Sequence, residues 1–281
     1  MELFDEVFNK ASIYDMLFFN IKAVLEYPTL AELQAKNPVM CERWKYLSKT
    51  KFNHEIREIK QIPQVVTNVG ETALLIQDNV YKDNAIYYPE FTRIVAITYA
   101  SVESENGQLK RYLKKIANED EFIVIATFID VLNKLSSEGA RSSPKYFPMF
   151  CGHNILNYDI PLLIKRFFKH IDRFKKNLSV DENLNLPFIL KNCLSAKPWE
   201  SKVIDTVNVW RFNGNDYTSL MLIADYLGLK KTVDLDALPD VSKTYWGTVT
   251  DKPEEALEYV SLQSATQTNL IIQLMNELRQ R

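Results

Sequence analysis

Asp159 is the residue whose type and position best fit metal-dependent chemistry in this sequence. It closes the run 150–159, in which an apolar stretch turns through a polar loop, containing Asn154 and Tyr158, into a helix-like segment. Phosphodiester cleavage by two metal ions needs several carboxylates, because they must hold cations about 3.5–4 Å apart. A single Asp therefore indicates this chemistry only if other carboxylates converge on it.

The elements that must position Asp159 follow from the hydrophobic pattern of the chain. Runs that are apolar or rich in β-branched residues predict five strands, at residues 13–21, 93–102, 109–116, 146–151 and 203–206. The second and third are expected to pair across Asn106–Gly107, a dipeptide typical of tight hairpins. Helical spacing predicts helices at 29–49 (split by Pro38), 71–79, 119–135, 160–170, 220–227 and 254–278.

Composition limits the class of protein. Two or three adjacent strands followed by alternating helices and strands predict one α/β domain over 1–281, with helical insertions near 29–90 and 169–202. The formal net charge of −2 means that any nucleic-acid contact must come from a local basic patch. The three cysteines are scattered, and no apolar run approaches the roughly 18 residues of a membrane span. We therefore expect a cytoplasmic protein with no membrane partner.

Four segments of the chain share their pattern with a known superfamily. They are residues 18–24, 91–97, 152–161, and 204–210 with 217–220. Together they resemble the DnaQ-like 3′–5′ exonucleases, and most of all the predicted exonucleases related to the proofreading domain of family B DNA polymerases. The resemblance covers roughly residues 13–275. It implies a ribonuclease H-like fold, in which a mixed central sheet is flanked by helices.

The chain departs from this family at the positions that hold its metal ions. The family's first motif supplies an Asp and a Glu, where this sequence has Asn20 and Lys22. Its last motif supplies a Tyr and, four residues later, an Asp; here Tyr259 is kept and Gln263 replaces the Asp. Among the four expected carboxylates, the resemblance leaves only Asp159.

That loss weakens metal binding for an electrostatic reason. Mg²⁺ and Mn²⁺ prefer anionic oxygen ligands, whereas the ammonium group of Lys22 would repel a cation at ~4 Å by a few kcal/mol at an effective dielectric constant of about 20. We therefore expect no competent catalytic residue and no cofactor, with Asp159 at most a weak metal ligand. Asp205 is the best candidate for a replacement carboxylate, ahead of Asp15, Glu26 and Glu258.

Several of these residues also have purely structural interpretations. Asp159 could cap the helix that follows it, in place of or in addition to a role as a ligand remnant. His153 and Asn154 are expected to bond within their loop. Tyr259 is expected to face the core with its hydroxyl at the pocket.

Nucleic-acid contacts have two candidate locations. Lys22, Asn154 and Tyr158 could contact a strand at the former metal pocket. The basic run 165–176, with interleaved aromatic residues, could follow a phosphate backbone, although a solvated amphipathic helix end is the commoner meaning of such a run.

Three functions are compatible with these residues. The first is a catalytically inactive exonuclease-like protein that binds single-stranded nucleic acid or a replication or repair protein. The second is an active 3′–5′ exonuclease with a rearranged site, which would require Mg²⁺ or Mn²⁺. The third is a structural or assembly protein that reuses the fold.

Overall fold

The computed structural model describes residues 12–52, 69–142, 148–177, 188–195, 201–211, 214 and 216–280. The chain forms two compact units. Unit 1 comprises Met1–Lys22, Ile94–Pro239 and Thr248–Arg281, and unit 2 comprises Ala23–Arg93 and Asp240–Gly247. The helical insertion expected near 29–90 therefore falls in unit 2. Whether both units fold as one domain stays a prediction.

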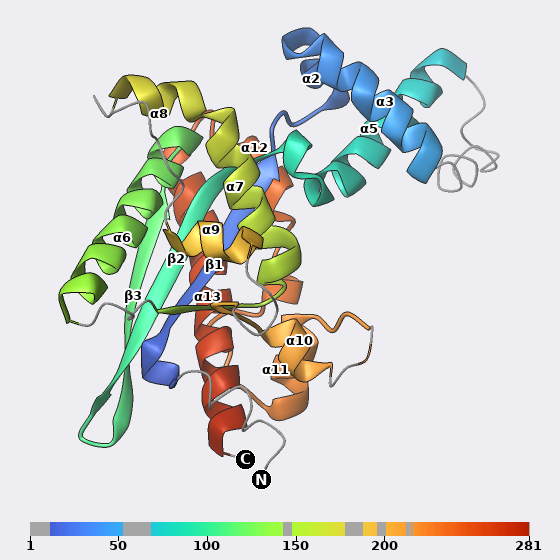
Figure 1. Ribbon diagram of the computed structural model, residues 1–281. Helices are drawn as coiled ribbons and strands as arrows, with labels where there is room; N and C mark the ends of the chain where they lie inside the picture. Colours follow the sequence, from blue (N-terminus) through green and yellow to red (C-terminus); the bar gives the residue numbers. More distant parts are fainter. Residues whose placement is uncertain are drawn as a thin grey trace. The chain divides into compact units, whose positions relative to one another are not determined.

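The sheet is mixed and has five strands, as the sequence predicted (Figure 1). Its strands are β1 (Met16–Leu25), β2 (Thr92–Glu105), β3 (Gln108–Ala117), β4 (Met149–Gly152) and β5 (Val203–Asp205), in the spatial order β3-β2-β1-β4-β5. Strands β2 and β3 are antiparallel, whereas β4 runs parallel to both β1 and β5. Parallel pairing places the carboxyl ends of β1, β4 and β5 at the same edge of the sheet.

The β2–β3 hairpin confirms the turn predicted at Asn106–Gly107. Glu105 pairs with Gln108, and both intervening residues have positive φ, 54° at Asn106 and 77° at Gly107. Asn and Gly are the residues that adopt this left-handed backbone at least cost, so they fix the turn type and the strand register.

The first and fourth strands begin later than predicted, while most of the other strand boundaries differ by a few residues. The apolar run from Ile13 begins with a short 3₁₀-helix, Ile13–Asp15, so β1 starts only at Met16. The hydroxyl of Ser12 accepts from the Tyr14 N–H and caps this turn. Strand β4 starts at Met149, and residues 143–147, where we predicted its beginning, lie outside the described residues.

Seven helices of unit 1 flank the sheet within the described ranges. They are α6 (Glu121–Ser142), α7 (Ile160–Lys169), α8 (Ile171–Asn177), α9 (Phe188–Ser195), α10 (Thr206–Trp210), α11 (Leu220–Leu227) and α13 (Pro253–Gln280). Successive strand side chains point to opposite faces, so Phe18 belongs to the core under α11 and α13, while Phe19 packs 5.5 Å, between ring centroids, from Phe128 of α6. Asn20 and Lys22 have the same parity as Phe18, so they face α13.

Unit 2 is a small helical cluster built around one buried tryptophan. Its helices are α2 (Leu30–Lys36), α3 (Pro38–Lys51), α5 (Val69–Asn84) and α12 (Val241–Thr248), with 3₁₀-turns at Ala85–Tyr87 and Pro89–Phe91. Trp44 packs against Tyr81 and Phe91, with ring centroids 5.5 and 5.2 Å apart. The predicted break at Pro38 is confirmed, because Pro38 begins α3 behind the N-cap Asn37.

Candidate functional site

The structure brings most of the predicted site residues into one cavity of unit 1, with a volume of about 370 Å³. Asn20 and Lys22 come from β1, Asp159 from the start of α7, and Gln263 from α13. Asn154 and Tyr158, which we expected at the pocket, also line it. One cavity is therefore lined by Asn20, Lys22, Asp159 and Gln263, although the first and last of these lie more than a hundred residues apart in the sequence. The resemblance implied this arrangement.

Asp159 is a buried carboxylate that does not cap its helix. It is 3% exposed, has helical backbone angles, and makes no side-chain capping hydrogen bond. The capping interpretation is therefore wrong, because the short π-helix Ile155–Asp159 continues directly into α7 and turns the carboxylate towards β1. There it accepts a hydrogen bond from the backbone of Ile21.

The charge state of Asp159 is set mainly by its burial. Desolvation raises the pKa of the Asp159 carboxyl well above its usual range, and the nearby charge of Asp205 raises it further. The ammonium group of Lys22 and the Ile21 N–H act in the opposite direction without overcoming burial. A buried carboxyl group that favours its uncharged form is a poor ligand for a hard cation. It would bind one only if a nearby positive charge compensated for burying the ionised form.

The ammonium group of Lys22 is a positive charge of the protein itself beside the Asp159 carboxyl. The residue as a whole is only partly buried, but its amino group is desolvated. Desolvation lowers the pKa of Lys22 to about 8, and the charge of Asp159 partly offsets this effect. At neutral pH Lys22 is therefore mostly protonated, and its charge opposes the entry of a metal ion.

The two amide side chains of the cavity differ in their bonding. Asn20 is 7% exposed, and its Oδ1 atom lies 3.2 Å from the hydroxyl of Ser264, which also lies 3.1 Å from the Asn20 carbonyl oxygen. Gln263 is 4% exposed, and its Nε2 atom has no hydrogen-bond partner among the described residues. An unbonded buried amide is costly, so the cavity presents one unsatisfied donor.

Asp205 does not replace the missing carboxylates. Its Oδ1 atom accepts from the N–H groups of Asn154 (2.9 Å) and Val207 (3.0 Å), and its Oδ2 atom accepts from Leu156 (3.0 Å). Burial nevertheless raises the pKa of Asp205 above its usual value. Two of these bonds fix the loop after β4 and the third caps α10, so the role of Asp205 is structural.

The other carboxylates considered as replacements are also engaged elsewhere or absent from the cavity. Glu258 lies 3.2 Å from the ammonium group of Lys115 on β3. Asp15 ends the 3₁₀-turn before β1 and does not lie on the strand as we had assumed. Neither Asp15 nor Glu26 lines the cavity.

The structure places Tyr259 away from the cavity, contrary to our expectation for its hydroxyl. The hydroxyl donates to the carbonyl oxygen of Pro239 at 2.7 Å, and Tyr259 is not part of the cavity lining. The residue lies one helical turn before Gln263, at the level of the segment that precedes α12.

The polar residues of the loop after β4 form hydrogen bonds both within the loop and to other segments. Asn154 adopts the left-handed conformation (φ 59°), and its Oδ1 atom accepts from Asn157 Nδ2 at 3.1 Å. His153 lies 2.8 Å from the hydroxyl of Thr206 and 3.0 Å from the carbonyl of Thr218. Burial lowers the pKa of His153 to about 4, so its neutral ring donates from Nε2 and accepts at Nδ1. Both residues therefore have structural roles, and Asn154 bonds within its loop as expected, whereas His153 bonds Thr206 and Thr218 outside it.

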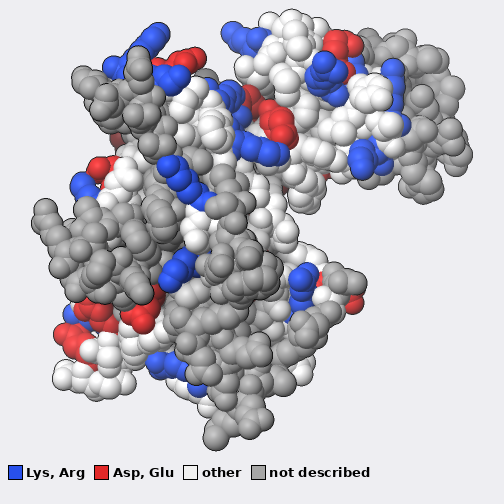
Figure 2. Space-filling model, viewed as in Figure 1, with Lys and Arg blue, Asp and Glu red and all other residues white. Residues whose placement is uncertain are grey.

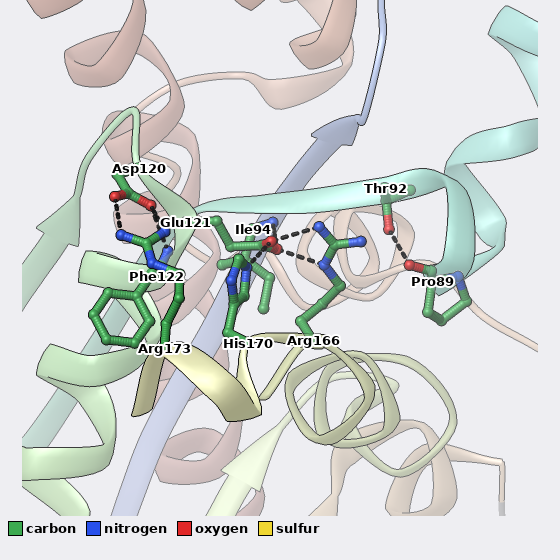
Figure 3. A network of polar contacts seen from close by, with 9 residues as sticks. All are labelled: Pro89, Thr92, Ile94, Asp120, Glu121, Phe122, Arg166, His170 and Arg173. Carbon is green, nitrogen blue, oxygen red and sulfur yellow. Dashed lines mark hydrogen bonds and ion pairs between the residues drawn. The ribbon is translucent and has the colours of Figure 1, made fainter. Parts of the chain in front are cut away.

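Three of the seven basic residues in the run 165–176, namely Arg166, His170 and Arg173, contact carboxylates (Figure 3). Glu121, 5% exposed, accepts from Arg166 Nε at 2.7 Å and Nη2 at 2.5 Å, from His170 Nε2 at 2.8 Å, and from the Ile94 N–H at 2.6 Å. Arg173 forms a bidentate pair with Asp120, at 2.9 and 2.7 Å. A nucleic-acid strand that contacted Arg166, His170 and Arg173 would have to compete for them with the carboxylates of Glu121 and Asp120.

Charges of both signs are mixed on the surface. On the face drawn in Figure 2, Lys and Arg are interspersed with Asp and Glu over the described residues. Within those residues, no group of three or more His, Cys, Asp or Glu side chains is arranged to hold a metal ion. No helix in the described ranges is both long and apolar enough to cross a bilayer.

Sequence reasoning missed the partners that complete the cavity. Ser264 follows Gln263 directly, but only the packing of α13 against β1 shows that it bonds Asn20. Tyr217 and Gln267 also line the cavity. No local motif marks these positions, although their nearness in sequence to the recognised segments could have suggested them.

We also compared the chain with known proteins. No protein-family model, no curated protein and no solved structure matches it. The residues of the cavity and their chemistry are therefore the basis for proposing a function.

Proposed function

We propose that this chain is a catalytically inactive, exonuclease-like protein of the ribonuclease H-like class that binds single-stranded nucleic acid without divalent metal. One observation carries the proposal: Asn20, Lys22, Asp159 and Gln263 line the same cavity. These are the positions at which the resemblance implies four metal-binding carboxylates, and they carry one acid, one ammonium group and two amides.

The residues present do not fit a pair of divalent cations. Hard cations in proteins are held by anionic oxygen atoms that compensate for lost water. Here burial favours the uncharged form of Asp159, Lys22 contributes a positive charge, and Asp205 accepts from three backbone N–H groups. Among the described lining residues Asp236 is the one further carboxylate, and it is exposed to solvent. No step of a metal-dependent mechanism can be built from these groups.

The fold supports the class without depending on the cavity. A hairpin of antiparallel strands joined to parallel strands, in the order β3-β2-β1-β4-β5, agrees with the ribonuclease H-like sheet that the resemblance implies. The long helix α13 covers the face on which Asn20 lies, where the resemblance places the last motif.

Binding is proposed from the donors that remain in the cavity. The ammonium group of Lys22 and the unsatisfied amide of Gln263 can both donate to an anionic or carbonyl oxygen. Nucleic acid supplies such oxygens on its phosphates and its bases. A replication or repair protein as the partner stays a second possibility within the same proposal, because no contact in the described residues distinguishes it.

The test combines a binding assay with a nuclease assay. Fluorescence anisotropy with a labelled oligothymidylate, in EDTA and at several salt concentrations, should show binding that weakens as salt rises. The substitutions Lys22→Ala and Gln263→Ala should each weaken it, by about tenfold for the charged group. Thr50→Ala, on the exposed surface of α3, is the matched control and should leave affinity unchanged.

The nuclease assay decides between the inactive and active hypotheses. Incubation of the oligonucleotide with Mg²⁺ or Mn²⁺ should yield no cleavage above that of the Asp159→Ala variant. Cleavage that disappears in Asp159→Ala and in EDTA would establish the active alternative. Failure to bind any oligonucleotide would leave the assembly function as the better explanation.

A further inference from the structure

A second cavity of unit 1 gathers positive charge away from Asp159. It measures about 330 Å³ and is lined by Arg111 of β3 and by Lys230 and Lys231 of the segment after α11. Residues of the C-terminal half of α13 complete it, among them Gln273 and Asn276. Residues from three distant parts of the sequence therefore converge on one small volume.

The segment that carries the two lysines is held in place by a reciprocal pair of hydrogen bonds. The Lys230 N–H donates to Gln273 Oε1 at 3.1 Å, and Gln273 Nε2 donates to the Lys230 carbonyl at 2.9 Å. Gly228, with φ 66°, ends α11 and turns the chain towards α13. The backbone positions of Lys230 and Lys231 are thus set before any ligand binds.

The distribution of acids around this cavity is uneven. Lys110 and Lys115, which flank Arg111 on β3, pair with Glu105 at 2.8 Å and with Glu258 at 3.2 Å. Lys231 is paired with Asp225. By contrast, neither Arg111 nor Lys230 forms an ion pair with any residue that the structure describes. Within the same residues, the side chain of Arg111 makes one long hydrogen bond, 3.3 Å, to Asn269 Oδ1.

Unpaired cations that share a small cavity repel one another, and an anion that contacts both removes this cost. Neutral donors are also present. Thr232 contributes a hydroxyl, and Asn276, whose Oδ1 accepts from Arg279, retains its amide N–H groups. A planar guanidinium with an ammonium group and neutral donors suits a multivalent oxyanion better than a single carboxylate.

We propose that this cavity is a phosphate-binding site, in which Arg111 and Lys230 contact the oxygen atoms of a phosphate group. Leu109 and Ile272 form an apolar part of the wall, against which the carbon portion of a phosphorylated ligand can pack. The phosphate belongs to a free phosphorylated compound or to a nucleic-acid strand. The site is independent of the cavity around Asp159 and of the function proposed for it.

The test uses the full chain and measures the affinity for inorganic phosphate by calorimetry at low salt. The double variant Arg111→Ala, Lys230→Ala should lose binding by about tenfold or more, since two charge-assisted contacts are removed. Lys114→Ala is the matched control, because Lys114 is an exposed cation of the same strand, three residues after Arg111 and therefore on the other face. It should change affinity by less than about twofold. Both altered sites are exposed, and circular dichroism melting curves should confirm unchanged folding.

Three further measurements decide the outcome. Acetate at the same concentration should not compete with phosphate, and equal competition by acetate would overturn the assignment to phosphate. An equal loss of phosphate affinity in Lys114→Ala and in the double variant would also overturn it. No phosphate binding by the unaltered chain would also overturn it. An unlabelled oligonucleotide that displaces phosphate identifies a strand as the source, whereas displacement only by a small phosphate monoester identifies a free compound. If Lys22→Ala weakens oligonucleotide binding while the double variant does not, the result concerns only the cavity around Asp159. The two proposals can therefore fail separately.

Discussion

Arg166 and Glu121 form a buried bidentate ion pair, with nitrogen–oxygen distances of 2.7 and 2.5 Å and side chains 3% and 5% exposed. The pair joins α7 to the first turn of α6, and Glu121 also accepts from the Ile94 N–H at the start of β2. Burial by itself would raise the pKa of Glu121, but the hydrogen bonds from His170 and Arg166 hold it below its usual value. Three elements therefore depend on one ionised carboxylate.

Glu121→Gln should reduce the free energy of unfolding by about 3–5 kcal/mol, because it leaves the Arg166 guanidinium buried without its counter-charge. Urea denaturation at pH 7 measures the loss. Arg173→Ala, at the exposed pair with Asp120, should cost no more than about 1 kcal/mol. The double variant Glu121→Leu, Arg166→Met should lose less than the sum of its single changes. Simple additivity would contradict the coupling that we infer.

The pH dependence of stability should carry a contribution from His153. Burial lowers its pKa from the ordinary value of 6.5 to about 4, so between these values the unfolded chain binds more protons than the folded one. Stability should therefore fall as pH is lowered through this window, by up to about 3 kcal/mol from this group. In His153→Gln the slope of unfolding free energy against pH should be smaller over the same window. An unchanged slope would show that His153 stays protonated in the folded chain.

Gly152 should not tolerate a side chain. A Cβ atom at this position would lie 2.7 Å from Ile155 Cδ1 and 3.0 Å from the carbonyl oxygen of Phe19. Gly152→Ala should therefore destabilise the chain by about 1–3 kcal/mol, through displacement of the loop that carries Asn154. Thermal unfolding checks this, with Gly247→Ala, where a Cβ atom meets nothing within 4 Å, as the control.

Restoring carboxylates to the first cavity should restore metal affinity. The triple variant Asn20→Asp, Lys22→Glu, Gln263→Asp adds three carboxylates to Asp159 and Asp236, which already line the cavity, and Mn²⁺ should bind at least about tenfold more tightly than to the unaltered chain. Calorimetry with Mn²⁺ measures this, and the single change Lys22→Glu should yield part of the gain. Because Asn20 bonds Ser264, folding must first be verified by circular dichroism. No gain in a folded triple variant would mean that the cavity geometry, and not its charge, excludes the metal.

Most elements of the fold could be predicted from the chain alone. Apolar and β-branched runs located the five strands, and helical spacing located α2, α3, α5, α6, α7, α11 and α13 but not α8, α9, α10 or α12. Asn106–Gly107 predicted the hairpin and Pro38 the helix break, because these are local effects of backbone sterics. The ends of these elements were predicted less well. Residues Ile13–Asp15, for example, are apolar enough for a strand but form a 3₁₀-turn that Ser12 caps.

The residue types at Asn20, Lys22, Asp159 and Gln263 were readable from the sequence, and with them the shortage of carboxylates for a metal pair. Only the tertiary structure decided that these four share a cavity, that Asp205 accepts from three backbone N–H groups, and that three residues of the basic run contact Asp120 and Glu121. The physical reason is that composition and spacing are local, whereas burial, hydrogen-bond saturation and ion pairing depend on which distant segments pack together.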